Sequence, residues 1–199
     1  MEKGIHSPVS YSLSSNDPSV TDDYILEGIM MSGKFHLEHV GKEEDDYAAS
    51  GEAISGFGLF ALTNERVQYH FREEDMSLDE AESYIGHCLN RLPEESIDDL
   101  CQKMCAWKDE VLSDYPDMNC PEGLPNAQGR DILPFLSVSD IYIYRNPYDA
   151  SDSLFGATVS AGMEWDFEDG IEIMIRGQKV LEVREFLGYG AHAIWEEND

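Results

Sequence analysis

The chain has 199 residues, of which 41 are acidic and 13 are basic, so its formal net charge is −28. This length suits one domain with a sizeable core. The charge disfavours direct binding to nucleic acid or to an anionic membrane surface, because both interactions depend on lysine and arginine. It favours a solvated acidic surface or a basic partner protein that is attracted electrostatically.

Residues 1–20 are rich in serine, proline and asparagine and show little periodicity, so we predict a loose arm before a single domain over 21–199. Alternating apolar residues then predict strands, and the Ser-Gly dipeptide at 32–33 would turn the first strand into the second. Residues 43–46 are predicted to form a solvated acidic loop. The strands predicted in this part of the chain are 24–31, 34–40, 57–62 and 66–71.

The period of the pattern becomes helical at Ser77, and we predict a helical pair over 77–115. Ser77 and Glu80 match a capping box, in which each residue accepts a hydrogen bond from the backbone of the other. Pro93 suits the first turn of the second helix, and Pro116 ends that helix by excluding helical geometry at the residue before it. Two helices joined so tightly are expected to pack as antiparallel neighbours. The apolar stripe of the second helix contains Ile97, Leu100, Cys101, Met104, Trp107 and Val111.

Four prolines and two glycines in 116–134 indicate an irregular connection to a second group of strands. In the first of these strands two isoleucines alternate with two tyrosines over 141–144, which is typical of a strand covered on both faces. Alternation over 171–184 around Gly177-Gln178 predicts a hairpin, with Leu181 and Val183 on one face. The strands predicted here are 139–145, 154–163 and the two halves of the hairpin. The expected fold class is α+β, a mainly antiparallel sheet from both ends of the chain with an inserted helical pair.

The usual catalytic motifs are absent from the sequence. Glycines 51, 56 and 58 are not followed by the Lys-Ser/Thr of a phosphate-binding loop, and there is no GxSxG or HExxH motif. His192 is the histidine of greatest interest, since with Asp166 or Glu168 it would form an acid–base unit. The alternative is a purely structural role for His192 at the edge of the sheet.

No metal or cofactor is predicted. His36 and His39 are three residues apart on a predicted strand and would point to opposite faces. The oxygen-rich segments 146–152 and 164–170 do not match the spacing of a calcium-binding EF-hand loop. The four cysteines, at positions 88, 101, 105 and 120, include no CxxC pair, which disfavours structural zinc and a disulfide framework. We expect buried free thiols.

The first twenty residues contain no apolar segment of the secretory type. No stretch of the chain approaches the ~20 apolar residues that a membrane-spanning helix needs. Together with the expected free thiols, these features predict a cytoplasmic protein that does not enter a membrane.

The C-terminal third resembles a known family. An Ile-Tyr-Ile-Tyr strand at 141–144 leads to a strand of small residues at 156–162, and then to Trp165-Asp166-x-Glu168-x-Gly170 and Gly177-x-Lys179-Val180. This order is similar to that of a family of bacterial domains of unknown function, in which β-hairpins precede two helices and a closing W-D-x-E-H-G hairpin. Asp169 stands where the family's histidine is expected, so no role of that histidine is carried over.

Three functions are compatible with these patterns. The first is a non-enzymatic binding domain for a basic protein, by analogy with acidic immunity proteins that pair with toxins; it rests on the charge and on the missing catalytic motifs. The second is a hydrolase or metal-dependent enzyme that uses His192 with Asp166 or Glu168. The third is a structural subunit of a homo-oligomer, such as a dimer formed through an exposed sheet edge.

Overall fold

The computed structural model describes residues 34–44, 52–163, 170–187 and 190–196, which lie in one compact unit from Lys34 to Asp199. The predicted arm at 1–20 and the predicted strand at 24–31 lie outside the described residues.

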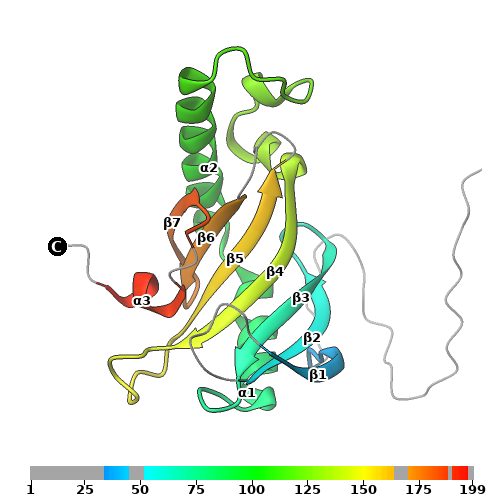
Figure 1. The fold of residues 1–199 in the computed structure, drawn as a ribbon, viewed down its shortest axis with the longest axis vertical. Helices are drawn as coiled ribbons and strands as arrows, with labels where there is room; N and C mark the ends of the chain where they lie inside the picture. Colours follow the sequence, from blue (N-terminus) through cyan, green and yellow to red (C-terminus); the bar gives the residue numbers. More distant parts are fainter. Residues whose placement is uncertain (1–33, 45–51, 164–169, 188–189, 197–199) are drawn as a thin grey trace, which may run out of the picture. The chain divides into compact units, whose positions relative to one another are not determined.

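Among the described residues, seven strands form one sheet, and they are neighbours in the order in which they follow along the chain (Figure 1). Five of the six strand pairs in this sheet are antiparallel, and the pair of β3 with β4 is parallel. The predicted α+β class with a mainly antiparallel sheet is therefore confirmed. The strands are β1 (Glu38–Glu44), β2 (Glu52–Phe60), β3 (Glu65–Arg72), β4 (Leu136–Arg145), β5 (Phe155–Met163), β6 (Ile171–Arg176) and β7 (Lys179–Glu185).

Helices occupy the connection between β3 and β4, because parallel neighbours need a crossover between their ends. Two α-helices and three short 3₁₀ helices form this crossover, and a short α-helix follows β7. They are α1 (Leu78–His87), η1 (Leu89–Arg91), α2 (Glu94–Asp114), η2 (Leu124–Asn126), η3 (Gly129–Phe135) and α3 (Gly190–Trp195).

The predicted helix ends are confirmed. The backbone N–H of Glu80 donates to Ser77 Oγ at 3.3 Å, and that of Ser77 donates to Glu80 Oε2 at 2.8 Å, which completes the capping box. α2 begins directly after Pro93 and ends before Tyr115, which leaves helical geometry (φ −125°, ψ 68°) because proline follows it.

The predicted packing of the two helices as an antiparallel pair is not confirmed. After η1 the chain takes two extended residues, Leu92 and Pro93, so α2 starts in a new direction. The main contacts of α2 are with β7 and η3. Figure 1 shows α1 and α2 near opposite ends of the sheet.

The main core lies between one face of the sheet and the crossover. The alternation predicted for β4 is confirmed, since Ile141 and Ile143 are buried in this core while Tyr144 points to the other face. On that second face a smaller apolar cluster forms where Ile194 and Trp195 of α3 pack on the sheet. The largest residues of the main core include Phe60, Tyr69, Ile85, Leu89, Leu100, Met104 and Ile132.

The segment before β1 departs from prediction. The predicted strand 34–40 begins at Glu38, and Glu43 and Glu44 belong to β1 instead of a loop. Residues 34–37 are not part of the strand; they pack over β2 and are tied to α1, because the backbone N–H of Leu37 donates to the buried Glu82 carboxylate at 2.9 Å. β1 pairs with β2.

The hairpin of β6 and β7 is confirmed, but one predicted face is wrong. Leu181 and Val183 do not share a face, since Val183 lies in the main core and Leu181 packs with the cluster under α3. The cause is a β-bulge, in which Met174 pairs with Glu182 while the next residue, Ile175, pairs with Val180. The extra residue reverses the alternation.

Candidate functional site

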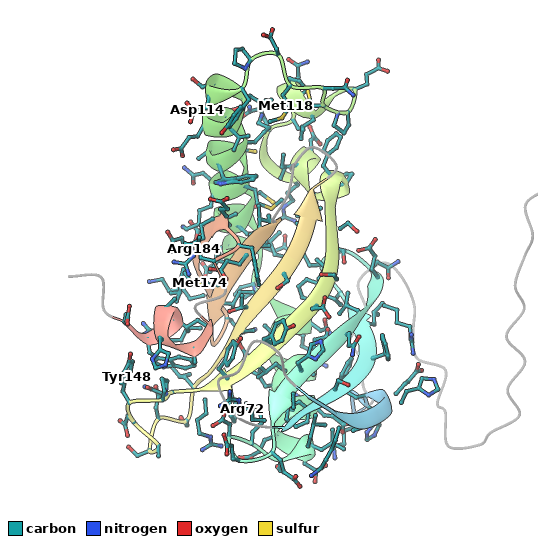
Figure 2. All side chains as sticks on the ribbon, viewed as in Figure 1. Arg72, Asp114, Met118, Tyr148, Met174 and Arg184 are labelled. Atoms are coloured by element: carbon teal, nitrogen blue, oxygen red, sulfur yellow. The ribbon has the colours of Figure 1, made fainter. Side chains whose placement is uncertain are left out.

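The C-terminal end of α2 and the turn after it form an acidic surface that we call the α2 tip, defined as Glu110, Asp114, Tyr115 and Asp117. All four side chains are exposed, and Tyr115 exposes 62% of its surface. Figure 2 places Asp114 at one extremity of the described unit. The tip therefore presents one aromatic ring among three carboxylates.

The basic residues near the tip do not neutralise it. The region 94–131 has ten acidic and three basic residues, and all three basic residues form ion pairs elsewhere. Those ion pairs are Lys103 with Asp99, Lys108 with Asp109, and Arg130 with Glu94 and Asp98. In the part of the chain that the structure describes, no ion pair reaches Glu110, Asp114 or Asp117.

The charges of the tip are unfavourable for the helix that carries them. The C-terminus of a helix carries partial negative charge and favours cations, yet the last turn of α2 has no basic residue. Glu110 and Asp114 are four residues apart, so their like charges are neighbours on the helix surface. The backbone still ends regularly, since the N–H of Tyr115 donates to the Val111 carbonyl at 2.9 Å. An approaching cation would relieve this repulsion.

Lys108 anchors the chain that returns from the tip. Its side chain is fully buried, and Nζ donates to the carbonyls of Pro125 and Ala127 at 3.3 and 2.9 Å. Nζ also lies 3.0 Å from Asp109 Oδ1, so all three ammonium donors have an acceptor. The predicted apolar stripe of α2 omits Lys108. Its spacing of four residues from the buried Met104 is the signal that would have included it.

An open hollow of about 450 Å³ lies between α2 and η3 and is lined in part by Cys101 and Cys105. Burial raises the pKa of Cys101 to about 11, so this thiol is protonated and a poor nucleophile at neutral pH. The prediction of buried free thiols is confirmed for these two cysteines. Cys88 and Cys120 are free but only half-buried.

Of the predicted C-terminal acid–base unit, the structure describes His192. His192 is exposed on α3, and its Nδ1 lies 3.0 Å from the Tyr148 hydroxyl. Asp166 and Glu168 lie outside the described residues. The contact of His192 is therefore with a phenol of the loop before β5.

The oxygen-rich loop 146–152 uses its side chains as turn acceptors. Asp149 Oδ1 accepts from the backbone N–H of Ser151, and Asp152 Oδ1 from that of Leu154, both at 2.9 Å. The hydroxyl of Ser151 also bonds Asp149, and the pKa of that carboxyl is lowered, chiefly by this bond. Local bonding of this kind accounts for the composition of the loop.

The second face of the sheet carries a histidine–carboxylate pair that does not follow from the sequence patterns. His70 Nε2 of β3 donates to Asp140 Oδ1 of β4 at 2.9 Å, and this bond is the main reason why the pKa of Asp140 is lowered. The His70 ring stacks on Tyr142, with centroids 4.6 Å apart. This pair joins two parallel strands, and the sequence patterns do not show that these strands are neighbours in the sheet.

The histidines predicted to point to opposite faces of one strand are arranged differently. His36 precedes β1 and its Nδ1 lies 3.0 Å from Glu82 Oε2, whereas His39 lies within β1 at a φ of +53°. Across the residues described, no group of three or more His, Cys, Asp or Glu side chains is arranged to hold a metal ion.

The family profile described as a domain of unknown function (DUF6985) matches residues 39–190. No curated protein and no solved structure matches the chain. None of the described helices is both long and apolar enough to cross a bilayer.

Proposed function

The chain belongs to the DUF6985 family, whose function is unknown, and from that premise we propose that it is a non-enzymatic domain that binds a basic partner protein through the α2 tip. The observation that carries the proposal is the uncompensated charge of the tip. Glu110, Asp114 and Asp117 are exposed at the end of a helix that has no cation in its last turn.

The chemistry of the tip suits a lysine- or arginine-rich surface. Its carboxylates would accept charge-assisted hydrogen bonds, and the approaching cations would also interact favourably with the C-terminus of α2. Tyr115 supplies an exposed aromatic ring beside them, and tyrosine is enriched among the residues that dominate binding energy. The whole chain, at −28, would attract such a partner over a long range.

Among basic partners, the analogy with acidic immunity proteins, which rests on the acidity of the chain, favours a toxin. We further propose a cytoplasmic location, which the free cysteines support because reducing compartments preserve thiols.

The proposal is tested by capturing partners on the immobilised chain at about 0.1 M salt and again at about 1 M, where the screening length falls from about 10 to 3 Å. The tip variant combines Glu110→Gln, Asp114→Asn and Asp117→Asn. A control variant with the same change of charge combines Glu65→Gln, Glu185→Gln and Glu196→Gln, which are exposed residues of other elements. We expect a basic protein that is recovered by the wild type and the control at low salt and lost by the tip variant.

Equal recovery by the tip variant would show that the partner binds elsewhere. If no basic protein is captured at low salt, the proposed function is wrong.

A further inference from the structure

The second face of the sheet brings polar side chains from adjacent strands together. Ser160 of β5 lies opposite Asp140 of β4 on one side and opposite Glu172 of β6 on the other. Thr158 is two residues before Ser160 and therefore points to the same face. Ser160 and Glu172 are directly opposed, so their Cβ atoms are about 5 Å apart, whereas Thr158 is a diagonal neighbour of Glu172 at about 7 Å, within reach of its long side chain.

Three oxygen atoms of this group have no hydrogen-bond partner within the described part of the chain: Thr158 Oγ1, Ser160 Oγ and Glu172 Oε2. All three atoms are buried, and the residue Glu172 has no exposed surface. More than nine in ten buried polar groups in folded proteins are paired with protein or with water, so three unpaired oxygens on one face of two adjacent strands indicate a further partner such as an ion or water. Glu172 Oε2 in particular needs a donor, since an ionised carboxylate only accepts.

Two carboxylates and one guanidinium carry the charges nearest these atoms. The other carboxylate oxygen of Glu172 accepts from Arg184 Nε at 2.6 Å, so this ion pair is formally neutral. Asp140, on the far side of Ser160, adds a further carboxylate, which is bonded to His70. Ser160 is half-buried, so the space borders the surface at that residue.

We propose that Thr158, Ser160 and Glu172 bind a small cation that donates hydrogen bonds, of the ammonium or primary amine class. A primary ammonium group has three N–H donors, and the three unpaired oxygens supply three acceptors. A charge-assisted bond to Glu172 Oε2 would be the strongest of the three. This site shares no residue with the α2 tip, so a negative result here would leave the proposed function untouched, and the reverse also holds.

The test is a titration of the full chain, followed by amide shifts in NMR and by the melting temperature, with four chloride salts at equal ionic strength. Ammonium and methylammonium are the probes. Tetramethylammonium carries the same charge without N–H donors, and sodium supplies charge alone. We expect saturable shifts at Thr158, Ser160 and Glu172 and a raised melting temperature with the two probes only.

Variants locate the site. Thr158→Val and Ser160→Ala should each weaken ammonium binding by about tenfold or more, the loss expected from one hydrogen bond of about 1.4 kcal/mol. Ser137→Ala, which removes an exposed hydroxyl from β4, should leave binding unchanged. In sodium chloride Thr158→Val should be at least as stable as the wild type, because it removes an unpaired buried hydroxyl.

The proposal would be overturned if all four salts caused identical amide shifts. It would also be overturned if the Thr158→Val variant bound ammonium as tightly as the wild type. A crystal structure would also overturn it if the density between the three oxygens were the same in crystals grown from ammonium chloride and from sodium chloride. Water alone would then bridge the oxygens. A Thr158→Val variant that is less stable in sodium chloride would likewise contradict it, because the hydroxyl would then have an internal partner.

Discussion

Lys108 Nζ lies 2.9 Å from the carbonyl oxygen of Ala127, and this buried contact closes the loop that carries the α2 tip. The last turn of α2, the turn at Tyr115 and η2 all lie between these two residues in the chain. The Lys108 side chain therefore ties the outgoing helix to the returning connection, and the tip projects beyond this tie.

Replacing Lys108 should destabilise the fold. Lys108→Ala would leave the carbonyl of Pro125 without its donor and that of Ala127 with only the weak Cys105 thiol, and would open a void, at a cost of about 3 kcal/mol in the free energy of unfolding. Chemical denaturation measures this cost. Lys103→Ala is the control, since Lys103 is partly exposed in its pair with Asp99, and it should cost less than about 0.5 kcal/mol. Similar losses for the two variants would contradict the anchoring role.

Removing a charge from the tip should stabilise the free protein slightly. Glu110→Gln relieves the repulsion with Asp114 and the unfavourable interaction with the helix C-terminus, a gain of about 0.3–0.5 kcal/mol at low salt. The gain should shrink at about 1 M salt because the charges are screened. Glu95→Gln, at the other end of the same helix, should give no gain, since acidic residues are favourable near an N-terminus. Destabilisation by Glu110→Gln would show that the tip charges have an internal role.

Cys101 should resist alkylation of the folded protein at pH 8. Its thiol is buried and its pKa is raised to about 11, so the reactive thiolate is scarce, and Cys120, which is half-buried, should react first. Mass spectrometry of alkylated peptides measures the order of modification. Modification of Cys101 before Cys120 would show that the α2 surface opens.

The raised pKa of Cys101 also makes stability depend on pH, because it favours the protonated thiol in the folded state. The raised pKa of Cys101 therefore adds its full contribution to the free energy of unfolding below the thiol's unfolded-state pKa of about 8.5. This contribution is lost as the pH rises toward 11.

Gly58 should not tolerate a side chain. A Cβ atom at this position would lie 2.5 Å from Phe35 Cζ, whereas a Cβ at Gly41 of the neighbouring strand would meet no atom within 4 Å. Gly58→Ala is therefore expected to cost about 1–3 kcal/mol through overpacking, and Gly41→Ala to be nearly neutral. Thermal unfolding compares the two variants. Equal stability would mean that residues 34–37 are not packed over β2.

The elements of the fold could largely be predicted from the sequence, because their signals are local. The capping box at Ser77, the proline before α2 and the alternation over β6 each depend on neighbouring residues. The parallel pairing of β3 with β4 could not be predicted, since period-two alternation is the same in parallel and antiparallel strands. The bulge that turns Leu181 away from Val183 depends on the register with β6, which the pattern of β7 alone does not contain.

The candidate sites were less accessible to sequence reasoning for the same reason. The acidity of α2 is visible in the sequence. That the nearby basic residues form ion pairs with acidic residues other than Glu110 and Asp114 depends on the fold. His70 and Asp140 are seventy residues apart and meet only because β3 and β4 are neighbours. The grouping of Glu172 with Ser160 likewise requires the strand register.

The binding role of the α2 tip is tested most directly by the association rate of the captured basic protein with the wild type, the tip variant and its charge-matched control. We predict that the wild type and the control associate with the same rate constant at about 0.1 M salt and that this rate falls steeply toward 1 M, whereas the tip variant associates slowly at both. A tip variant that associates as fast as the control, with the same dependence on salt, would contradict the claim that the α2 tip is the binding surface.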